Sequence, residues 1–429
     1  MIKTCVLENG IRVSSFHSSQ TERVNIALYF KGGPLYEPPH LNGISHFLEH
    51  MFFRKLDFLE KEDLYFQYEK IGAIFRGATY QDFVRFDISV SNIFFKEAFN
   101  LIQLILNDFT WNEADVEKEK QIVLKQIELK GAPFFSKYVD TYYLANKRYC
   151  NPIMGAESTV RTFHADILNK WKRNIFSPSN CYYCITGNFS DEHYLYAIES
   201  LSSKQSENHF VNQQNPIITV KDFCQKSEST DKIVGTNYDT SDISLIFDAD
   251  KAIHSEYTLT LLSCILCGGG GSRLTSVLRE QYALTDEMES FAGFFPDFSR
   301  LVLEFSTDNA NLLQTLQLVF EQISLLKKNI VQKDIDTTIH FHTTNLFWGL
   351  EDPRELNFWI AWRDFILQRE VDFEKIIDSY NQVTIDNLLL CANNVFRPEN
   401  LMIAITNNSK LCKRKDLKEK MNACRALLN

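Results

Sequence analysis

The sequence lacks the long hydrophobic run that a membrane-spanning helix requires. Its longest apolar stretches, residues 98–106 and 259–267, are interrupted or too short, because about 20 consecutive apolar residues are needed to cross a bilayer. The segment that begins at Met1 also lacks the pattern of a signal peptide. We therefore expect a cytoplasmic protein with no transmembrane segment.

An excess of positive charge is missing as well. The net charge is −10 at pH 7, and the basic cluster Lys413-Arg414-Lys415 is typical of a solvated terminal helix. A protein that binds nucleic acid usually carries a basic surface that neutralises phosphates. We therefore expect no nucleic-acid partner, and cationic ligands are favoured if the negative charge lines a cleft.

The chain has ten cysteines, yet they form no disulfide framework, because they are spread through apolar segments. Two pairs have C-x-x-C spacing, Cys181 with Cys184 and Cys264 with Cys267. Together they could in principle hold zinc with four thiolates. Each pair lies inside an apolar run, so the sequence favours core packing of reduced thiols over metal binding.

The length of 429 residues is too great for one ordinary hydrophobic core and predicts two domains of about 200 residues each. The polar stretch at residues 202–216 has the composition of a turn or linker. We expect an N-terminal domain at residues 1–205, a linker at 206–215 and a C-terminal domain at 216–429.

The two halves repeat one pattern at a spacing of 220 residues, the spacing of Asp166 and Asp386. The matching residues of the first half are Asp166, Asn174, Phe176, Pro178, Asn180, Ile185, Thr186 and Asn188. Each copy predicts a helix, a turn built on proline and asparagine, and a strand at 181–186 or 401–406. The pattern indicates an internal duplication and an α+β protein of two similar domains.

Hydrophobic periodicity predicts the remaining elements of each domain. Strands are expected at residues 11–13, 24–31, 85–91, 243–247 and 300–305, and a long helix at 310–327. Each domain should therefore be a sheet covered by helices.

The segment His46-Phe-Leu-Glu49-His50 carries the most specific chemical signal. Histidines at i and i+4 lie one above the other on a helix, so both can direct a nitrogen at one zinc ion, and Glu49 lies on the same face as a base. An apolar stripe on the neighbouring face supports a helix: Ile44, Phe47, Leu48, Met51 and Phe52. The alternative is a chance grouping on a solvated helix, and the motif favours metal chemistry.

Around this motif the chain resembles the pitrilysin, insulinase and mitochondrial processing peptidase family of inverted zinc peptidases, with the pattern H-x-x-E-H. The resemblance covers essentially the whole chain and includes Gly32-Gly33-Pro34, Ile71-Gly72-Ala73, residues 117–124 and Gly268 to Leu274. It implies that each half is an α/β sandwich, that the chain is half of a peptidase clamshell, and that two chains enclose an unfolded peptide.

The resemblance also implies a third zinc ligand on a later helix, preceded by a supporting glutamate seven positions earlier. These positions hold Gln126 and Glu119 in this chain. Glu128 cannot substitute easily, because it is rotated by about 200° from Gln126 on a helix. An amide in place of a carboxylate is a weaker ligand, so we expect zinc to be bound by His46 and His50 with Gln126, at reduced affinity.

The family further holds the substrate carbonyl with an arginine and a tyrosine seven residues apart. Arg279 matches, but Asp286 occupies the tyrosine position, and Tyr282 lies only three residues from Arg279. Arg279 therefore has two readings, a substrate contact or a surface ion pair with Asp286 or Glu280.

By the same resemblance, Gly77, Ala78 and Thr79 belong to an edge strand that pairs with the substrate peptide. The alternative for this segment is an ordinary hairpin strand.

The loop at Gly268 to Gly271 lacks the Gly-Lys-Ser/Thr of a phosphate-binding loop, so nucleotide binding is not expected. The loop is either a mobile segment that contacts peptide or a plain connection between helices. His340 and His342 are expected in surface or packing roles.

The sequence thus predicts a zinc endopeptidase subunit that hydrolyses peptides or short unfolded segments, with Glu49 as the base and Glu119 as a carboxylate that orients a ligating histidine or the surroundings of the ion. It should work in a dimer with a second family member that supplies the intact carbonyl clamp. The alternative is a non-catalytic peptide-binding or scaffold subunit with a degenerate metal site, for which Gln126 and Asp286 are the motivation.

Overall fold

The computed structural model describes residues 2–56, 59–129, 151–204, 231–250, 254–295, 298–369 and 371–429. The predicted linker at 206–215 lies outside these residues. The chain forms two compact units. The first contains the described residues of Met1–Pro133, Lys147–Ile217 and Trp348–Asp372. The second contains the described residues of Ile218–Phe347 and Phe373–Asn429. Among the described residues, the units depart from the proposed limits of 1–205 and 216–429 at Trp348–Asp372, which packs with the first unit.

The first unit is built on a six-stranded sheet with the order β1-β2-β8-β3-β7-β6. Its strands are β1 (Lys3–Val6), β2 (Arg12–His17), β3 (Arg23–Lys31), β6 (Ile74–Thr79), β7 (Phe83–Ser91) and β8 (Cys181–Gly187). β2 and β8 run parallel, and the other neighbours are antiparallel. β6 therefore lies at an edge of the sheet.

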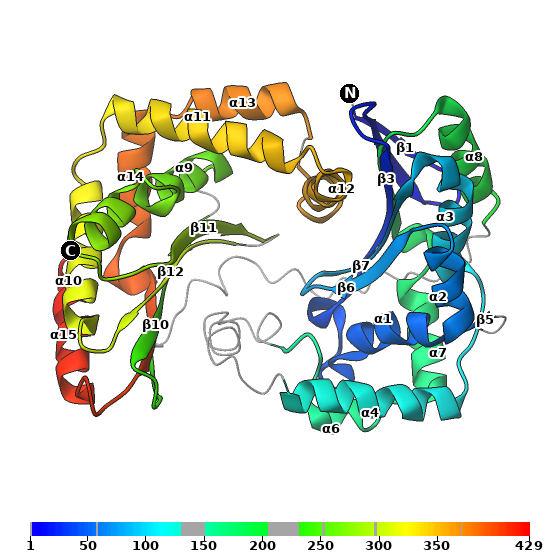
Figure 1. Cartoon of the computed structure of the whole chain (residues 1–429), viewed down its shortest axis with the longest axis horizontal. Helices are drawn as coiled ribbons and strands as arrows, with labels where there is room; N and C mark the ends of the chain where they lie inside the picture. Colours follow the sequence, from blue (N-terminus) through cyan, green and yellow to red (C-terminus); the bar gives the residue numbers. More distant parts are fainter. Residues whose placement is uncertain are drawn as a thin grey trace. The chain divides into compact units, whose positions relative to one another are not determined.

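Helices cover one face of this sheet (Figure 1). They are α1 (Ile44–Arg54), α2 (Lys61–Glu69), α3 (Phe95–Ile102), α4 (Glu113–Leu129), α6 (Glu157–Val160), α7 (Ala165–Ile175) and α8 (Asp191–Ser202). A small hairpin of β4 (Lys55–Leu56) and β5 (Leu59–Glu60) follows α1. Alternate residues of β3, such as Val24 and Phe30, join the apolar core under these helices. This alternation is the period of two that a strand imposes on its side chains.

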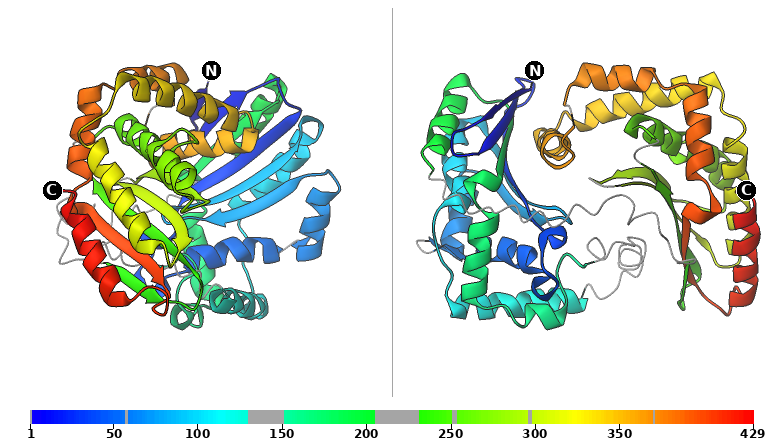
Figure 2. Two further views of the ribbon diagram at one scale, coloured as in Figure 1. Left: turned by 60° about the vertical axis from the view of Figure 1, so that its left-hand side comes forward. Right: turned by 180° about the vertical axis from the view of Figure 1, so that it is seen from behind.

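The opposite face of the sheet is covered by α12 (Pro353–Ala361) and the short π-helix η9 (Trp362–Ile366), which come from late in the chain (Figures 1 and 2). This face is polar. Tyr29 Oη donates to Asn357 Oδ1 at 2.9 Å, and Asn357 Nδ2 donates to the backbone oxygen of Cys184 at 2.7 Å. The segment is therefore attached by hydrogen bonds in addition to apolar contacts.

A buried ion-pair network completes this attachment. Arg85 and Asp87 are each 2% exposed in their side chains and lie 3.2 Å apart, while Arg354 of α12 lies 3.0 Å from the second carboxylate oxygen of Asp87. Two guanidinium groups thus share one buried carboxylate. Removing that carboxylate would leave uncompensated buried charge, which is strongly destabilising.

The second unit contains a five-stranded sheet with the order β11-β12-β10-β13-β9. Its strands are β9 (Lys232–Gly235), β10 (Thr240–Ala249), β11 (Met288–Phe294), β12 (Ser299–Asp308) and β13 (Leu401–Asn407). The helices are α9 (Glu256–Cys267), the π-helix η8 (Thr275–Gln281), α10 (Leu312–Leu326), α11 (Gln332–Gly349), α13 (Phe373–Asn381), α14 (Ile385–Val395) and α15 (Arg414–Ala426). Figure 1 shows α10, α14 and α15 on one side of this sheet.

The predicted duplication is confirmed element by element. α7, the 3-10 turn Pro178–Asn180 and β8 recur as α14, the turn Pro398–Asn400 and β13, with every boundary displaced by the same 220 residues that separate Asn180 from Asn400. The repeated asparagine has the same task in both copies, because Asn180 and Asn400 each donate to a backbone oxygen at the end of the preceding helix, at 2.9 and 3.2 Å. Such bonds satisfy carbonyl groups that a helix end leaves without a partner.

The predicted strands and helix also agree with the structure. The region predicted at 24–31 lies in β3, that at 85–91 in β7, and the helix expected at 310–327 is α10. The cysteines within the described residues are free thiols, and most are buried. No helix in the described part of the chain is long and apolar enough to cross a membrane.

Candidate metal centre

α1 carries the H-x-x-E-H residues, and its start is fixed by Glu37, which no sequence pattern indicated. The Glu37 carboxylate accepts hydrogen bonds from the backbone N–H groups of Gly43 and Ser45 at 2.7 and 2.8 Å and from Asn42 Nδ2 at 3.0 Å. A negative charge is favourable at a helix N-terminus, where backbone N–H groups have no partner within the helix. Burial raises the pKa of Glu37, and these hydrogen bonds oppose that shift.

The inward face of α1 buries five apolar side chains, Ile44, Phe47, Leu48, Met51 and Phe52. Each large apolar side chain contributes about 1.5–3 kcal/mol when it is removed from water. This packing fixes the rotation of the helix and turns the neighbouring stripe, which carries the chemistry, away from the core.

His46, Glu49 and His50 lie together on that stripe. One ligand atom from each comes within 4.8 Å of the others, and all three side chains are half-buried. The imidazole centroids are 4.6 Å apart. Within the described residues this is the one group of three or more histidine, cysteine, aspartate or glutamate side chains close enough to hold an ion, so the C-x-x-C pairs form no four-thiolate site.

The donor set suits zinc. Two imidazole nitrogens and one carboxylate oxygen are ligand types that zinc accepts, and the half-buried setting leaves room for a further ligand such as water. Glu49 thus has two possible tasks, as a base beside the ion or as a ligand itself.

Glu119 of α4 supports His50. Its side chain is 4% exposed, and Oε1 lies 2.9 Å from His50 Nδ1, while Oε2 lies 3.4 Å from the Arg54 guanidinium. A carboxylate on one ring nitrogen holds the proton there and leaves the other nitrogen, Nε2, as the electron-pair donor. This is the arrangement that a metal-binding histidine requires.

Glu49 sits against the edge strand β6. Thr79 Oγ1 donates to Glu49 Oε2 at 3.2 Å. Burial raises the pKa of Glu49, whereas the nearby His50 and the Thr79 hydrogen bond lower it. A base whose pKa is raised toward neutrality accepts a proton more readily.

Gly77 makes this close approach possible. A Cβ atom placed on Gly77 would collide with Glu49 Oε1 and would lie 2.8 Å from a ring carbon of Phe53. Gly77, Ala78 and Thr79 pair with β7 opposite Phe86, Arg85 and Val84. Their other side is the edge of the sheet, next to Glu49.

Gln126 lies on α4 two turns after Glu119, and its side chain is half-buried. Residues seven apart on a helix share a face about 10 Å apart along the axis. Gln126 makes no hydrogen bond with His46 or His50 within the described residues. Glu128 is exposed, as expected for a residue on another face.

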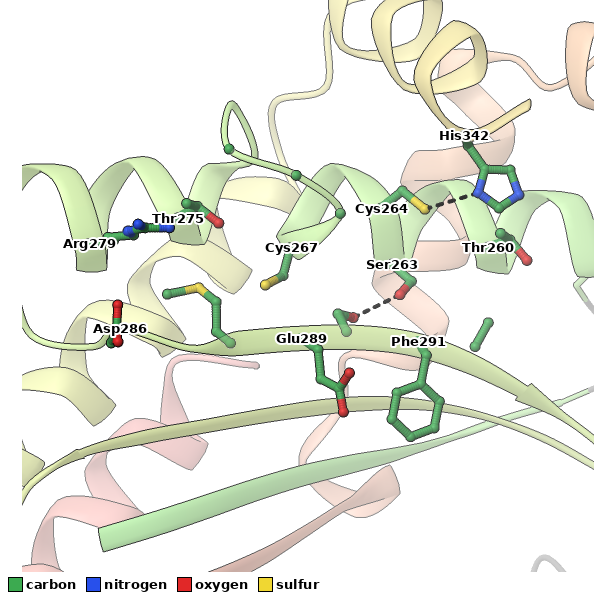
Figure 3. Close-up of a pocket in the computed structure, with 16 residues that line it drawn as sticks. Thr260, Ser263, Cys264, Cys267, Thr275, Arg279, Asp286, Glu289, Phe291 and His342 are labelled. Atoms are coloured by element: carbon green, nitrogen blue, oxygen red, sulfur yellow. Dashed lines mark hydrogen bonds between the residues drawn. The ribbon is translucent and has the colours of Figure 1, made fainter. Parts of the chain in front are cut away.

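The predicted substrate contacts of the second half lie around a cavity of about 590 Å³ in the second unit (Figure 3). Arg279 and Asp286 are at one end of it, and Cys264 and His342 are at the other. Arg279 Nε lies 3.7 Å from Glu280 Oε1, so the surface ion pair with Glu280 is present. Tyr282 is 49% exposed and does not line the cavity.

The glycine-rich loop, through Gly268 to Gly270, and His342 also line this cavity. His342 Nδ1 lies 3.7 Å from Cys264 Sγ, and Nε2 lies 3.0 Å from Tyr380 Oη. These contacts join α9, α11 and α13, which agrees with the packing role expected for His342. Gly268 packs directly on the backbone of Cys264, whereas Gly270 has open space around it.

Comparison with known proteins agrees with this geometry. Two sequence profiles match the chain, one described as Insulinase (Peptidase family M16) over residues 12–154 and one as Peptidase M16 inactive domain over residues 162–340. The uncharacterized zinc protease YmxG of Bacillus subtilis is 22% identical over 416 residues, which cover 96% of this chain and 100% of that protein. Mitochondrial-processing peptidase subunit beta of Homo sapiens is 20% identical over 402 residues, which cover 89% and 80%.

A solved structure supports the same assignment at the level of the fold. A protease from Helicobacter pylori superposes with a TM-score of 0.80 at 16% sequence identity, covering 95% of this chain and 99% of that chain. This similarity confirms the expected fold class. With two matching profiles that together span most of its length, the chain belongs to peptidase family M16, the insulinase family.

Proposed function

We propose that this chain is a zinc-dependent endopeptidase subunit that hydrolyses peptides or short unfolded segments. The observation that carries the proposal is the grouping of His46, Glu49 and His50 within 4.8 Å. The position of Glu119, 2.9 Å from His50 Nδ1, supports it. The similarity over 96% of this chain to a protein named as an uncharacterized zinc protease supports it further.

In this proposal His46 and His50 hold zinc, and Gln126 is the candidate for the third position. When bound, zinc supplies a Lewis acid that polarises the peptide carbonyl and acidifies water. Glu49 accepts a proton from the attacking water and later delivers it to the leaving amine nitrogen. Glu119 keeps the His50 ring in position and in the required tautomer.

The substrate peptide is proposed to bind as an added strand beside β6. The free edge of a sheet offers backbone N–H and C=O groups to an extended peptide. Because Gly77 brings the backbone of β6 against Glu49, such a peptide would pass close to the proposed base. The residues that would contact it are Gly77, Ala78 and Thr79.

A homologous partner subunit is proposed because the carbonyl clamp is altered. Arg279 is paired with Glu280, and Asp286 has no aromatic ring or hydroxyl to offer. A second family member with an arginine and a tyrosine at these positions would supply what this chain lacks. The relatives include a protein named as a subunit of mitochondrial-processing peptidase.

A cytoplasmic location is also proposed, and cell fractionation tests it.

A non-catalytic scaffold remains the second candidate, and Gln126 favours it. An amide in place of a carboxylate removes one negative charge from the proposed site, which weakens binding of a divalent cation. In that case the chain binds peptide without cutting it.

The test is cleavage of an unstructured peptide library by the full chain, alone and mixed with family members from the same genome, with zinc supplied. We expect cleavage by at least one mixture, and we expect Glu49→Gln to lower the rate by about a hundredfold or more because the base is lost. Glu128→Gln is the matched control, because Glu128 is exposed on α4 and outside the cluster. Cleavage that Glu49→Gln leaves unchanged would refute the catalytic role, and peptide binding without cleavage would favour the scaffold.

A further inference from the structure

The two faces of β6 present different side chains at the edge of the sheet. Gly77 and Thr79 lie on the α1 side, where both approach the Glu49 carboxylate. Ile74 and Arg76 lie on the other side, because side chains alternate along a strand, and both are exposed. They line a cavity of about 580 Å³ beside the first residues of α12. A peptide paired with β6 would place every second side chain on this cavity side.

Arg76 forms no ion pair within the described residues, although an aspartate stands opposite it. Arg76 pairs in register with Asp87 of β7, and such residues carry their side chains to the same face, with Cβ atoms about 5 Å apart. The Asp87 carboxylate is already occupied, because it lies 3.2 Å from Arg85 Nε and 3.0 Å from Arg354 Nε. It also accepts a hydrogen bond from Asn25 Nδ2 at 3.2 Å. Asp87 thus serves the buried network and not Arg76.

Two acidic side chains of α12 and its cap line the same cavity, and both have other partners. Glu355 Oε1 lies 3.1 Å from Arg354 Nη1. Asp352 Oδ2 lies 2.6 Å from Arg23 Nη1. Each of these carboxylates therefore already has an arginine beside it.

Glu22 lines the far end of the cavity. In the register of the sheet, Arg76 is level with Ala27 of β3, five residues along the strand from Glu22. Five residues of a strand extend about 17 Å. Charges that far apart are largely screened from each other at physiological salt, where the screening length is about 8 Å. The part of the cavity beside Arg76 thus carries a positive charge that no neighbouring carboxylate of the described residues offsets.

Resting on the peptidase function proposed above, we propose that Arg76 selects peptides with an aspartate or glutamate at the position that pairs with it. The peptide carboxylate would lie on the cavity side, where a guanidinium can bind it through two parallel hydrogen bonds. The adjacent peptide residue is opposite Gly77 and faces Glu49. The acidic residue is therefore close to the bond that is cut, and Arg76 determines specificity without taking part in the chemistry.

The test uses short unstructured peptides of uncharged residues, blocked at both ends, with a central glutamate, glutamine or lysine. The blocked ends leave the side chain as the one source of a carboxylate. Cleavage is measured with the full chain in its active mixture, and mass spectrometry locates the cut. We expect the glutamate peptide to be cut at a fixed distance from the glutamate, with kcat/KM about threefold to tenfold above that of the glutamine peptide.

Variants of Arg76 separate its charge from its bulk. Arg76→Gln should lose the preference for glutamate, and Arg76→Glu should shift the preference to the lysine peptide. Arg76→Lys keeps the charge and should keep a weaker preference. Arg173→Glu is the matched control, because Arg173 is exposed on α7 and does not line the cavity. It should select peptides as the wild type does.

Binding is measured in parallel by fluorescence anisotropy of the same peptides, labelled, on the Glu49→Gln variant. Tighter binding of the glutamate peptide, abolished when Arg76→Glu is added, supports the selection by Arg76 even where no mixture cleaves, and then the peptidase function alone fails. Cleavage without any preference leaves the peptidase function standing and overturns the role of Arg76. Survival of the preference in Arg76→Glu, or absence of peptide binding altogether, overturns it as well.

Discussion

Glu119 Oε1 lies 2.9 Å from Nδ1 of His50, although the two residues are 69 positions apart in the chain. The contact joins α4 to α1 and fixes which nitrogen of His50 carries the proton. It is the strongest indication that His50 is prepared to bind a metal, because a helix-surface histidine without that task has no need of a buried carboxylate behind it.

Replacing Glu119 with alanine should therefore weaken zinc binding by about 10–100-fold, the usual effect of removing the carboxylate behind a metal-binding histidine. Competition with a chromophoric chelator measures this directly. The control is Glu117→Gln, because Glu117 is exposed on the same helix. If Glu119→Ala binds zinc as tightly as the wild type, Glu119 has no supporting role.

Gln126→Glu should have the opposite effect. Restoring a carboxylate at the proposed third position adds a charge-assisted contact of about 1.5–3 kcal/mol and should tighten zinc binding by about tenfold or more. The same chelator assay reports it. Equal or weaker affinity would show that Gln126 does not face the ion and that the third position has been assigned to the wrong residue.

Gly77→Ala should damage the site without adding or removing a polar group. The new Cβ would meet Glu49 Oε1 and the Phe53 ring, so either the strand or Glu49 must move, at a cost of about 1–3 kcal/mol. We expect reduced stability in urea unfolding and reduced cleavage.

Gly235→Ala is the matched control for that variant, because a Cβ there meets nothing within 4 Å and the backbone has no unusual φ. It should be nearly neutral or slightly stabilising. Similar losses from both substitutions would mean that close packing on Glu49 is not the cause.

Asp82 gives a prediction about pH, at the hairpin between β6 and β7. Burial raises the pKa of Asp82 from 3.8 to about 6. A folded-state pKa above the unfolded value means that the folded protein binds the proton more tightly, so the stabilisation is present below pH 3.8 and is lost as the pH rises through about 6.

Asp82→Asn removes this charge, so the variant should be more stable than the wild type at pH 8 by up to about 3 kcal/mol. The difference should shrink toward zero near pH 4. Urea unfolding at several pH values measures it. A difference that stays constant with pH would show that the ionisation of Asp82 does not cause it.

Local features were accessible from the sequence. The spacing of His46, Glu49 and His50 predicted a helix with its chemical groups on one face, and the repeat that contains Asn180 and Asn400 predicted the duplication, with strand ends within one residue of those observed. Both depend on periodicity and register, which a sequence displays directly.

The features that escaped the sequence depend on contacts between distant segments. Nothing near Glu37 marks it as the cap of α1, and Gly77 reads as an ordinary strand glycine until Glu49 is placed against it. Likewise, Trp348–Asp372 follows the second unit's helices in the chain, but its partners are Tyr29, Arg85 and Asp87. Hydrogen bonds across 267 or more residues leave no periodic signal.

The most direct test of the central claim, that His46 and His50 hold zinc, is the zinc content of the purified full chain after equilibration with the metal and gel filtration. The wild type should retain one zinc per chain, His46→Ala should lose it, and His340→Ala, which removes an exposed histidine of α11, should keep it. Absence of zinc from the wild type, or zinc retained by His46→Ala as in the wild type, would contradict the account.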